Sequence, residues 1–177
     1  MRTVCNRAAL GALAGWLLLA GAAGAGDPCL TLDGLVRMEK CELERLYCQG
    51  RPCPVPQGCT RGKAISCPGT VFAVPASKVM GLAWKGKIFD PCESTMINRW
   101  CNKTSRPAKV YVAESWFDGK PSIIMDYCGM SEKWGDVRDE IREVAPGLYL
   151  GLMYKRRCEG PKFVRFFALE AEKPCCE

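Results

Sequence analysis

The chain has 177 residues, with 25 Lys and Arg, 19 Asp and Glu, 13 Cys, no His and a formal net charge of +6. Without histidine it cannot form a Ser-His-Asp or Cys-His catalytic site, a histidine-ligated haem site, or any zinc site other than an all-thiolate one. Basic residues are scattered among acidic ones, and only Lys155-Arg156-Arg157 form a tight cluster. Such a distribution favours a solvated surface over a nucleic-acid site. We therefore expect no metal, no cofactor and no nucleic-acid partner.

Residues 1–25 have the features of a secretory signal peptide. Arg2 and Arg7 form a basic start, Ala8 to Ala20 is almost wholly apolar, and the small residues 23–25 offer a cleavage pattern. The apolar stretch is short for a membrane span, so an uncleaved anchor is the weaker alternative. We expect a mature protein that is secreted or held in an extracytoplasmic lumen. Its membrane contact would be made only through the signal segment.

Cysteine usage predicts disulfides. Cys5 leaves with the signal peptide, and twelve cysteines remain, an even number that is typical of bridges in an exported chain. Up to six bridges are possible, and the sequence leaves their pairing open. Residues 26–70 hold six of these cysteines, at positions 29, 41, 48, 53, 59 and 67. Apolar residues at three- and four-residue steps predict a helix over Leu32–Tyr47 within this segment. We expect residues 26–70 to form a cysteine-rich helical and loop segment.

Residues 71–177 are expected to form an antiparallel β domain. Short apolar or β-branched runs alternate there with turn residues, which indicates a sandwich or barrel, and no segment is long enough for the crossover helices of a parallel sheet. The strongest hairpin signal is Asp118-Gly119 between two such runs. The expected strands are Val71–Val74, Gly81–Phe89, Ile97–Trp100, Lys109–Phe117, Ser122–Tyr127, Val137–Val144, Tyr149–Tyr154 and Phe163–Leu169.

The register of this hairpin decides which of its polar residues face the interior. A two-residue turn places Glu114 on the face of Met125 and Tyr127, whereas a three-residue turn places it with Ile124 and Asp126. A carboxylate inside an apolar lumen would have a raised pKa and could act as an acid or base. The alternative is that these charges form an exposed ladder on the surface of the sheet.

Three segments resemble lipocalin-like (calycin) β-barrels. The run Gly81-Leu82-Ala83-Trp84-Lys85-Gly86-Lys87 is similar to the opening barrel strand of that family, and residues 139–151 and 163–169 resemble its second half. The resemblance implies a barrel with a bound molecule in its lumen. It also implies that Trp84 closes one barrel end and stacks beneath Arg142 or Arg165. A cysteine-rich segment followed by such a barrel resembles violaxanthin de-epoxidases in architecture, although no active-site motif of theirs is present.

These observations lead to three functional hypotheses. The first is a disulfide-stabilised, lipocalin-like protein that binds a small hydrophobic molecule, with a site lined by Trp84, Glu114, Trp116, Met125 and Arg142. The second is an enzyme, an isomerase or hydrolase acting on such a molecule, with acid–base residues among Glu114, Asp126 and Tyr127. The third is a disulfide-rich interaction module with a filled core. The sequence does not decide among them, and it does not give the ligand or the oligomeric state.

Overall fold

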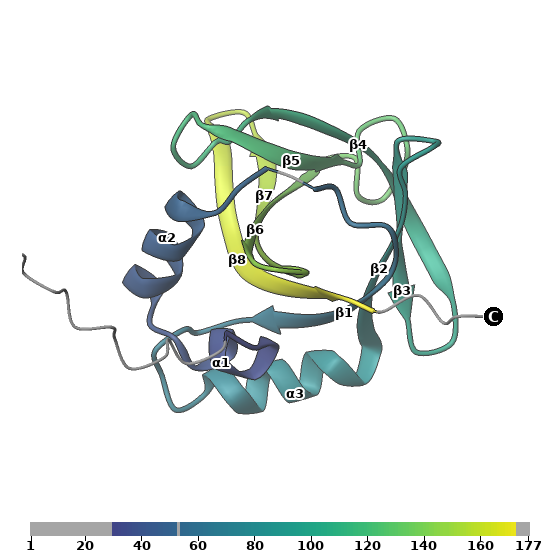
Figure 1. Cartoon of the computed structure of the whole chain (residues 1–177). Helices are drawn as coiled ribbons and strands as arrows, with labels where there is room; N and C mark the ends of the chain where they lie inside the picture. Colours follow the sequence, from purple (N-terminus) through teal and green to yellow (C-terminus); the bar gives the residue numbers. More distant parts are fainter. Residues whose placement is uncertain (1–29, 53, 173–177) are drawn as a thin grey trace, which may run out of the picture.

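The structure is a computed structural model that describes residues 30–52 and 54–172, and the expected signal peptide lies outside these residues. The described chain forms a closed barrel of eight antiparallel strands with three helices on its outside (Figure 1). The antiparallel barrel is therefore confirmed, and the sandwich is excluded. The strands are β1 (Gly58–Ile65), β2 (Trp84–Asp90), β3 (Thr95–Trp100), β4 (Thr104–Glu114), β5 (Pro121–Asp126), β6 (Val137–Ala145), β7 (Leu148–Arg157) and β8 (Gly160–Ala171). The helices are α1 (Leu32–Arg37), α2 (Lys40–Gln49) and α3 (Ala73–Ala83).

Each strand pairs with the next one in the chain, and β8 pairs with β1 to close the barrel. The closing strand β1 falls inside residues 26–70, which we expected to precede the barrel. The expected boundary at residue 70 therefore separates β1 from the sheet to which it belongs. Its sequence, GCTRGKAI, holds two glycines and few apolar residues, so it gives little strand signal.

Helix α3 replaces two expected pieces of strand. The run Val71–Val74 leads into the helix, and Gly81 to Ala83 form its last turn. The strand that contains Trp84 therefore begins at Trp84, and it is the second strand of the barrel. Pro75 explains part of this difference, because proline is tolerated in the first turn of a helix but removes a hydrogen bond from a central strand. None of the described helices is long and apolar enough to cross a membrane.

The helix expected over Leu32–Tyr47 is divided into α1 and α2. Thr31 caps the first, accepting a hydrogen bond from the Gly34 amide at 3.0 Å, and Glu39 and Glu42 form a reciprocal capping box that starts the second. A new cap in the middle of the pattern ends one helix and begins another. The apolar faces of both helices pack against the outer side of the barrel, in a cluster that includes Leu35, Leu43, Leu150, Leu152 and Phe166.

A second apolar cluster lies in the barrel interior, and a segment of the chain crosses one end of the barrel. The segment after α2 runs across the ring of strands before it enters β1 (Figure 1). Arg51 exchanges backbone hydrogen bonds with Glu143, and the Tyr149 hydroxyl donates to the Pro54 carbonyl at 3.0 Å. Val55 packs against the interior cluster. This crossing seals the end where β7 begins.

The predicted disulfides are not present among the described cysteines. All of these are unpaired: Cys41, Cys48, Cys59, Cys67, Cys92, Cys101, Cys128 and Cys158. In the described residues, α1 and α2 are therefore held on the barrel by apolar packing and hydrogen bonds. The cysteines at positions 29, 53, 175 and 176 lie outside the described residues. The disulfide framework stays a prediction.

A bulge in β2 requires glycine at position 86. The pairing of β2 with β3 shifts by one residue between Trp84 and Gly86, and Gly86 has φ +137°. A Cβ atom there would lie 2.1 Å from the Thr60 carbonyl oxygen. We expect Gly86→Ala to lower the free energy of unfolding by about 3 kcal/mol or more in urea denaturation. Gly81→Ala is the control, since its Cβ would meet open space on α3. Similar losses in both variants would contradict the argument.

Candidate functional site

A cavity of about 380 Å³ lies at the end of the barrel opposite the Val55 crossing, where β2 begins and β7 ends, and it is open on one side. This volume lies within the range of roughly 300–1,000 Å³ that small-molecule sites occupy. Its walls are mainly aromatic and aliphatic, with a few polar side chains among them. The lining includes Ala64, Met80, Trp84, Trp100, Trp134, Met153 and Phe167, together with Lys87, Asn98, Arg106, Asp139 and Arg165.

Four buried polar side chains, here called the lumen network, meet beside this cavity: Lys87, Asn98, Tyr127 and Asp139. The Lys87 Nζ atom donates to Tyr127 at 2.7 Å, to Asp139 Oδ2 at 2.8 Å and to Asn98 Oδ1 at 3.1 Å. The Tyr127 hydroxyl donates to Asp139 Oδ2 at 3.1 Å and accepts from Asn98 Nδ2 at 2.8 Å. Trp84 Nε1 completes the set by donating to Asn98 at 3.1 Å. Residues from β2, β3, β6 and the end of β5 are thus joined inside the barrel.

The surroundings of the lumen network shift its protonation equilibria. Burial lowers the pKa of the Lys87 ammonium, and the nearby Asp139 carboxylate partly opposes this. The Lys87 Nζ atom also lies 5.4 Å to 5.8 Å from the ring centroids of Trp84, Tyr127 and Phe167, where a cation is attracted to the aromatic faces. Burial raises the pKa of Tyr127 well above its usual value. Tyr127 therefore stays protonated at neutral pH and serves as a hydrogen-bond donor.

Three buried polar atoms of cavity-lining residues have no hydrogen-bond partner. They are the acceptor Asp139 Oδ1 and the donors Trp100 Nε1 and Arg165 Nε. Buried polar atoms in native proteins are almost always paired with protein groups, water or a ligand. One acceptor and two donors without a partner thus belong to residues that line the same cavity. In the described residues, no three cysteine or carboxylate side chains gather as ligands for a metal ion.

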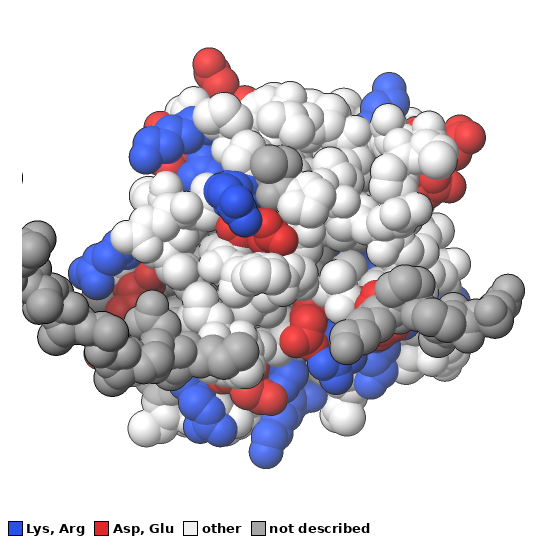
Figure 2. Space-filling model, viewed as in Figure 1, with Lys and Arg blue, Asp and Glu red and all other residues white. Residues whose placement is uncertain are grey.

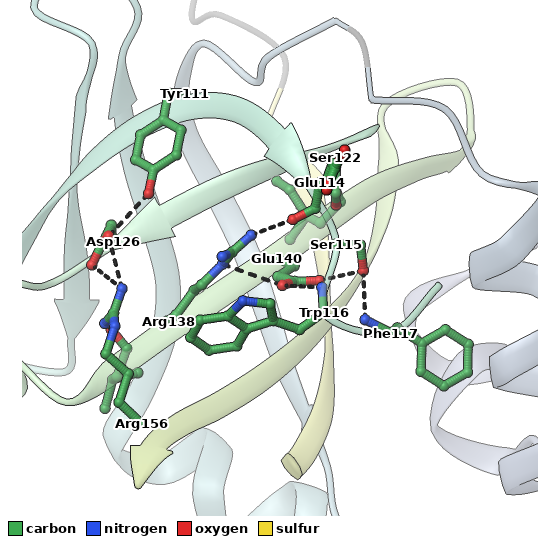
Figure 3. A network of polar contacts seen from close by, with 12 residues as sticks. Tyr111, Glu114, Ser115, Trp116, Phe117, Ser122, Asp126, Arg138, Glu140 and Arg156 are labelled. Atoms are coloured by element: carbon green, nitrogen blue, oxygen red, sulfur yellow. Dashed lines mark hydrogen bonds and ion pairs between the residues drawn. The ribbon is translucent and has the colours of Figure 1, made fainter. Parts of the chain in front are cut away.

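The structure places Arg142 and Trp116 outside the lumen, in contrast to the expected ligand site. Alternation along β6 directs Asp139 inward and Arg138, Glu140 and Arg142 outward, where α2 and residues 115–120 cover them. Arg138 lies under the Trp116 ring at 4.2 Å and pairs with Glu140 at 3.2 Å (Figure 3). The guanidinium of Arg142 lies 4.4 Å from the Tyr47 ring centroid. The cation near Trp84 is Lys87, so Arg142 does not take the stacking role that the lipocalin resemblance implied.

Neither candidate carboxylate of the hairpin faces the cavity. Glu114 is exposed at the end of β4, paired in register with Pro121 across the loop of residues 115–120. Asp126 points outward and binds both Arg156, at 2.8 Å, and the Tyr111 hydroxyl, at 2.9 Å (Figure 3). The geometry gives these two carboxylates no contact with a molecule in the lumen.

Three other candidates lie inside the barrel. Trp84 lines the cavity, Tyr127 belongs to the lumen network, and Met125 is buried in the interior cluster. Arg165, the second arginine that the resemblance implied near Trp84, also lines the cavity, so Trp84, Tyr127 and Arg165 are the sequence-predicted residues that the structure brings to the candidate site.

Comparisons with known proteins support the fold and no particular activity. No protein-family model matches the chain, and no curated protein matches it. A solved protein from Thermomonospora curvata superposes with a TM-score of 0.52 and 19% sequence identity, over 77% of this chain and 90% of that one. At this identity the likeness shows the barrel fold alone, and the name of that protein states no activity.

Sequence reasoning missed Lys87, Asn98 and Asp139. The sequence does contain a signal for Asp139, because this residue lies between Val137 and Ile141 on the apolar face of β6. A lone carboxylate on such a face indicates a buried polar contact. The sequence contains no comparable signal for Lys87, because the bulge at Gly86 changes the alternation of inward and outward side chains along β2.

Proposed function

We propose that the barrel binds a small, mainly apolar molecule that carries a hydrogen-bonding group such as a hydroxyl. The observation that supports this most is the unpartnered Asp139 Oδ1, a buried acceptor at a cavity with aromatic walls. A ligand hydroxyl could donate to Asp139, while its oxygen accepts from Trp100 Nε1 or Arg165 Nε. Apolar walls with a few placed polar groups are the usual composition of small-molecule sites.

The topology is in keeping with this proposal. Closed up-and-down barrels such as lipocalins hold ligands inside the ring of strands. In this chain one barrel end is sealed by the Val55 crossing, and the cavity lies at the other end. The lipocalin-like assignment, secretion and the disulfides form part of the proposal, and they rest on the residues quoted from the sequence. A module with a completely filled core is less favoured, because the barrel holds a cavity of about 380 Å³.

The experiment compares two matched probes, 1-decanol and decane. Trp84, Trp100 and Trp134 line the cavity, so tryptophan fluorescence reports its occupation. We expect the alcohol to bind about tenfold more tightly, since a hydrogen bond to a charged group contributes roughly 1.5–3 kcal/mol. Native mass spectrometry of the protein from its own source would then identify the natural ligand. If neither probe changes the fluorescence and no molecule co-purifies, the proposal fails.

A substitution that fills the cavity should abolish binding. Ala64 lines the cavity, so we expect Ala64→Phe to weaken 1-decanol binding at least tenfold by occupying the space of the ligand. Val112→Phe is the matched control, because Val112 is 53% exposed and does not line the cavity. Thermal unfolding of both variants checks that they fold. Unchanged affinity in a folded Ala64→Phe protein would place the site elsewhere.

The second candidate function is an enzyme acting on the bound molecule, an isomerase or hydrolase. It is favoured by the mutual contact of Lys87, Tyr127 and Asp139, which are buried titratable groups beside the cavity. Tyr127 would donate a proton, and Asp139 would accept one at its unpartnered oxygen. Conversion of the natural ligand, lost in Asp139→Asn while binding persists, would support this function. A ligand recovered unchanged after prolonged incubation would favour the carrier.

A further inference from the structure

Helix α3 carries an exposed apolar face. Val71 and Phe72 at its start, and Val79 and Leu82 along it, are 66% to 84% exposed. Positions 72, 75, 79 and 82 follow steps of three and four residues and therefore lie on one side of the helix. Ala73 and Ser77 are buried on the side that faces the protein. A hydrophobic stripe exposed on a surface helix indicates an interaction site.

The charged residues that belong to this segment of the chain are all basic. From Pro68 to Phe89 the chain has no Asp or Glu, and Lys78 and Lys85 are exposed there. Lys and Arg side chains project along the lower edge of the molecule in Figure 2, the edge that α3 forms in Figure 1.

Acidic residues near this face are already paired with basic ones. They belong to a depression of about 1,010 Å³ lined by α1, α3 and β1, where Asp33 pairs with Lys63, Glu170 with Arg61 and Glu172 with Arg99. Because these acidic side chains are paired, the unpaired positive charge beside the apolar face comes from Lys78 of α3 and Lys85 of β2.

The apolar face adjoins the mouth of the lumen cavity. Met80 of α3 lines the cavity, and Trp84, which also lines it, follows the last residue of the helix. The Ala83 carbonyl accepts a hydrogen bond from the Cys101 amide at 2.9 Å, which fixes the end of α3 against the end of β3. A surface that holds α3 would therefore lie beside the entrance to the cavity.

We propose that α3 docks the protein on an anionic membrane surface. Val79, Leu82 and Phe72 enter the interface between headgroups and acyl chains, and Lys78 and Lys85 contact the lipid phosphates. An exposed apolar stripe with lysines and no acidic residue fits the interface of such a membrane. A protein partner fits less well, because lysine is depleted in protein–protein interfaces. The proposal is independent of the lumen site, and it adds a membrane contact beyond the signal segment.

The test measures co-sedimentation of the full chain with vesicles of phosphatidylcholine, alone or mixed with phosphatidylserine. We expect Val79→Asp/Leu82→Asp to weaken binding to the mixed vesicles at least tenfold, and each of Lys78→Glu and Lys85→Glu to weaken it about fivefold. Val112→Asp is the control, because Val112 is an exposed apolar residue on β4 that should leave binding unchanged. All of these variants are full-length and share residues 1–25. Differences in their vesicle binding therefore do not arise from that segment.

Three outcomes would overturn the proposal. They are equal binding by all variants, no preference for phosphatidylserine, and an effect of the α3 substitutions on self-association or on capture of a protein partner but not on vesicle binding. The Ala64→Phe variant distinguishes membrane docking by α3 from ligand binding in the barrel cavity. We expect this variant to lose 1-decanol and keep its vesicle affinity, whereas the α3 variants should do the reverse.

Discussion

Replacing Arg142 with methionine is expected to lower the free energy of unfolding by about 3–5 kcal/mol. The Arg142 guanidinium binds both carboxylate oxygens of Asp118, at 2.7 Å and 2.8 Å, and donates to the backbone carbonyls of Tyr47, Lys120 and Pro121 at 3.0 Å to 3.1 Å. Its side chain is 1% exposed. Removing it would leave four acceptor groups in the contact between α2, β6 and the 115–120 loop without their donor.

Two further variants test this explanation by urea denaturation at neutral pH. Arg142→Lys should recover little stability, because one ammonium cannot reproduce the planar fork that reaches Asp118 and three carbonyls. Arg61→Met is the matched control, because Arg61 pairs with Glu170 and the two side chains are 64% and 33% exposed. We expect a loss of at most about 1 kcal/mol there. Comparable losses for Arg142→Met and Arg61→Met would show that the buried contacts contribute little.

The fold could be predicted from the sequence where apolar residues mark the strands and clear turn residues separate them. Strands β5 to β8 match the expected runs closely, because apolar residues recur along each of them and glycine or proline lies in or beside their turns. Strand β1 was missed, since its glycines and charged residues carry almost no apolar signal. The last turn of α3 was read as strand because Gly81-Leu82-Ala83 precedes Trp84 without a break in composition.

The candidate site was harder to predict, because both faces of part of the barrel are buried. A strand pattern shows which residues share a face, but it does not show that α2 and the 115–120 loop cover the outer face of β6. The sequence therefore offered only a lumen or solvent for charges on that face, such as Glu140, and it favoured solvent. Glu140 is 0% exposed, yet it lies outside the barrel and binds Ser115 and the Trp116 amide. The site itself depends on Lys87, whose inward position follows from the bulge at Gly86.

Asp139→Asn should destabilise the protein by about 3 kcal/mol or more, because it leaves the buried Lys87 ammonium without a charged partner. The two side chains are 5% and 2% exposed and lie 2.8 Å apart. Asp136→Asn provides the matched control for urea denaturation. Asp136 meets Lys155 and Arg157 at 3.6 Å and 3.7 Å on the surface, so its loss should be at most about 1 kcal/mol.

The double variant Lys87→Met/Asp139→Leu separates stability from binding. Replacing a whole buried ion pair with apolar residues of similar volume is often neutral or stabilising, so this protein should be more stable than Asp139→Asn and close to the native chain. It should nevertheless bind 1-decanol and decane with similar affinity, because the acceptor for the hydroxyl is gone. That combination would show that the lumen network is retained for a ligand, since the fold does not need it. A stable double variant that still prefers the alcohol would remove Asp139 from the proposed site.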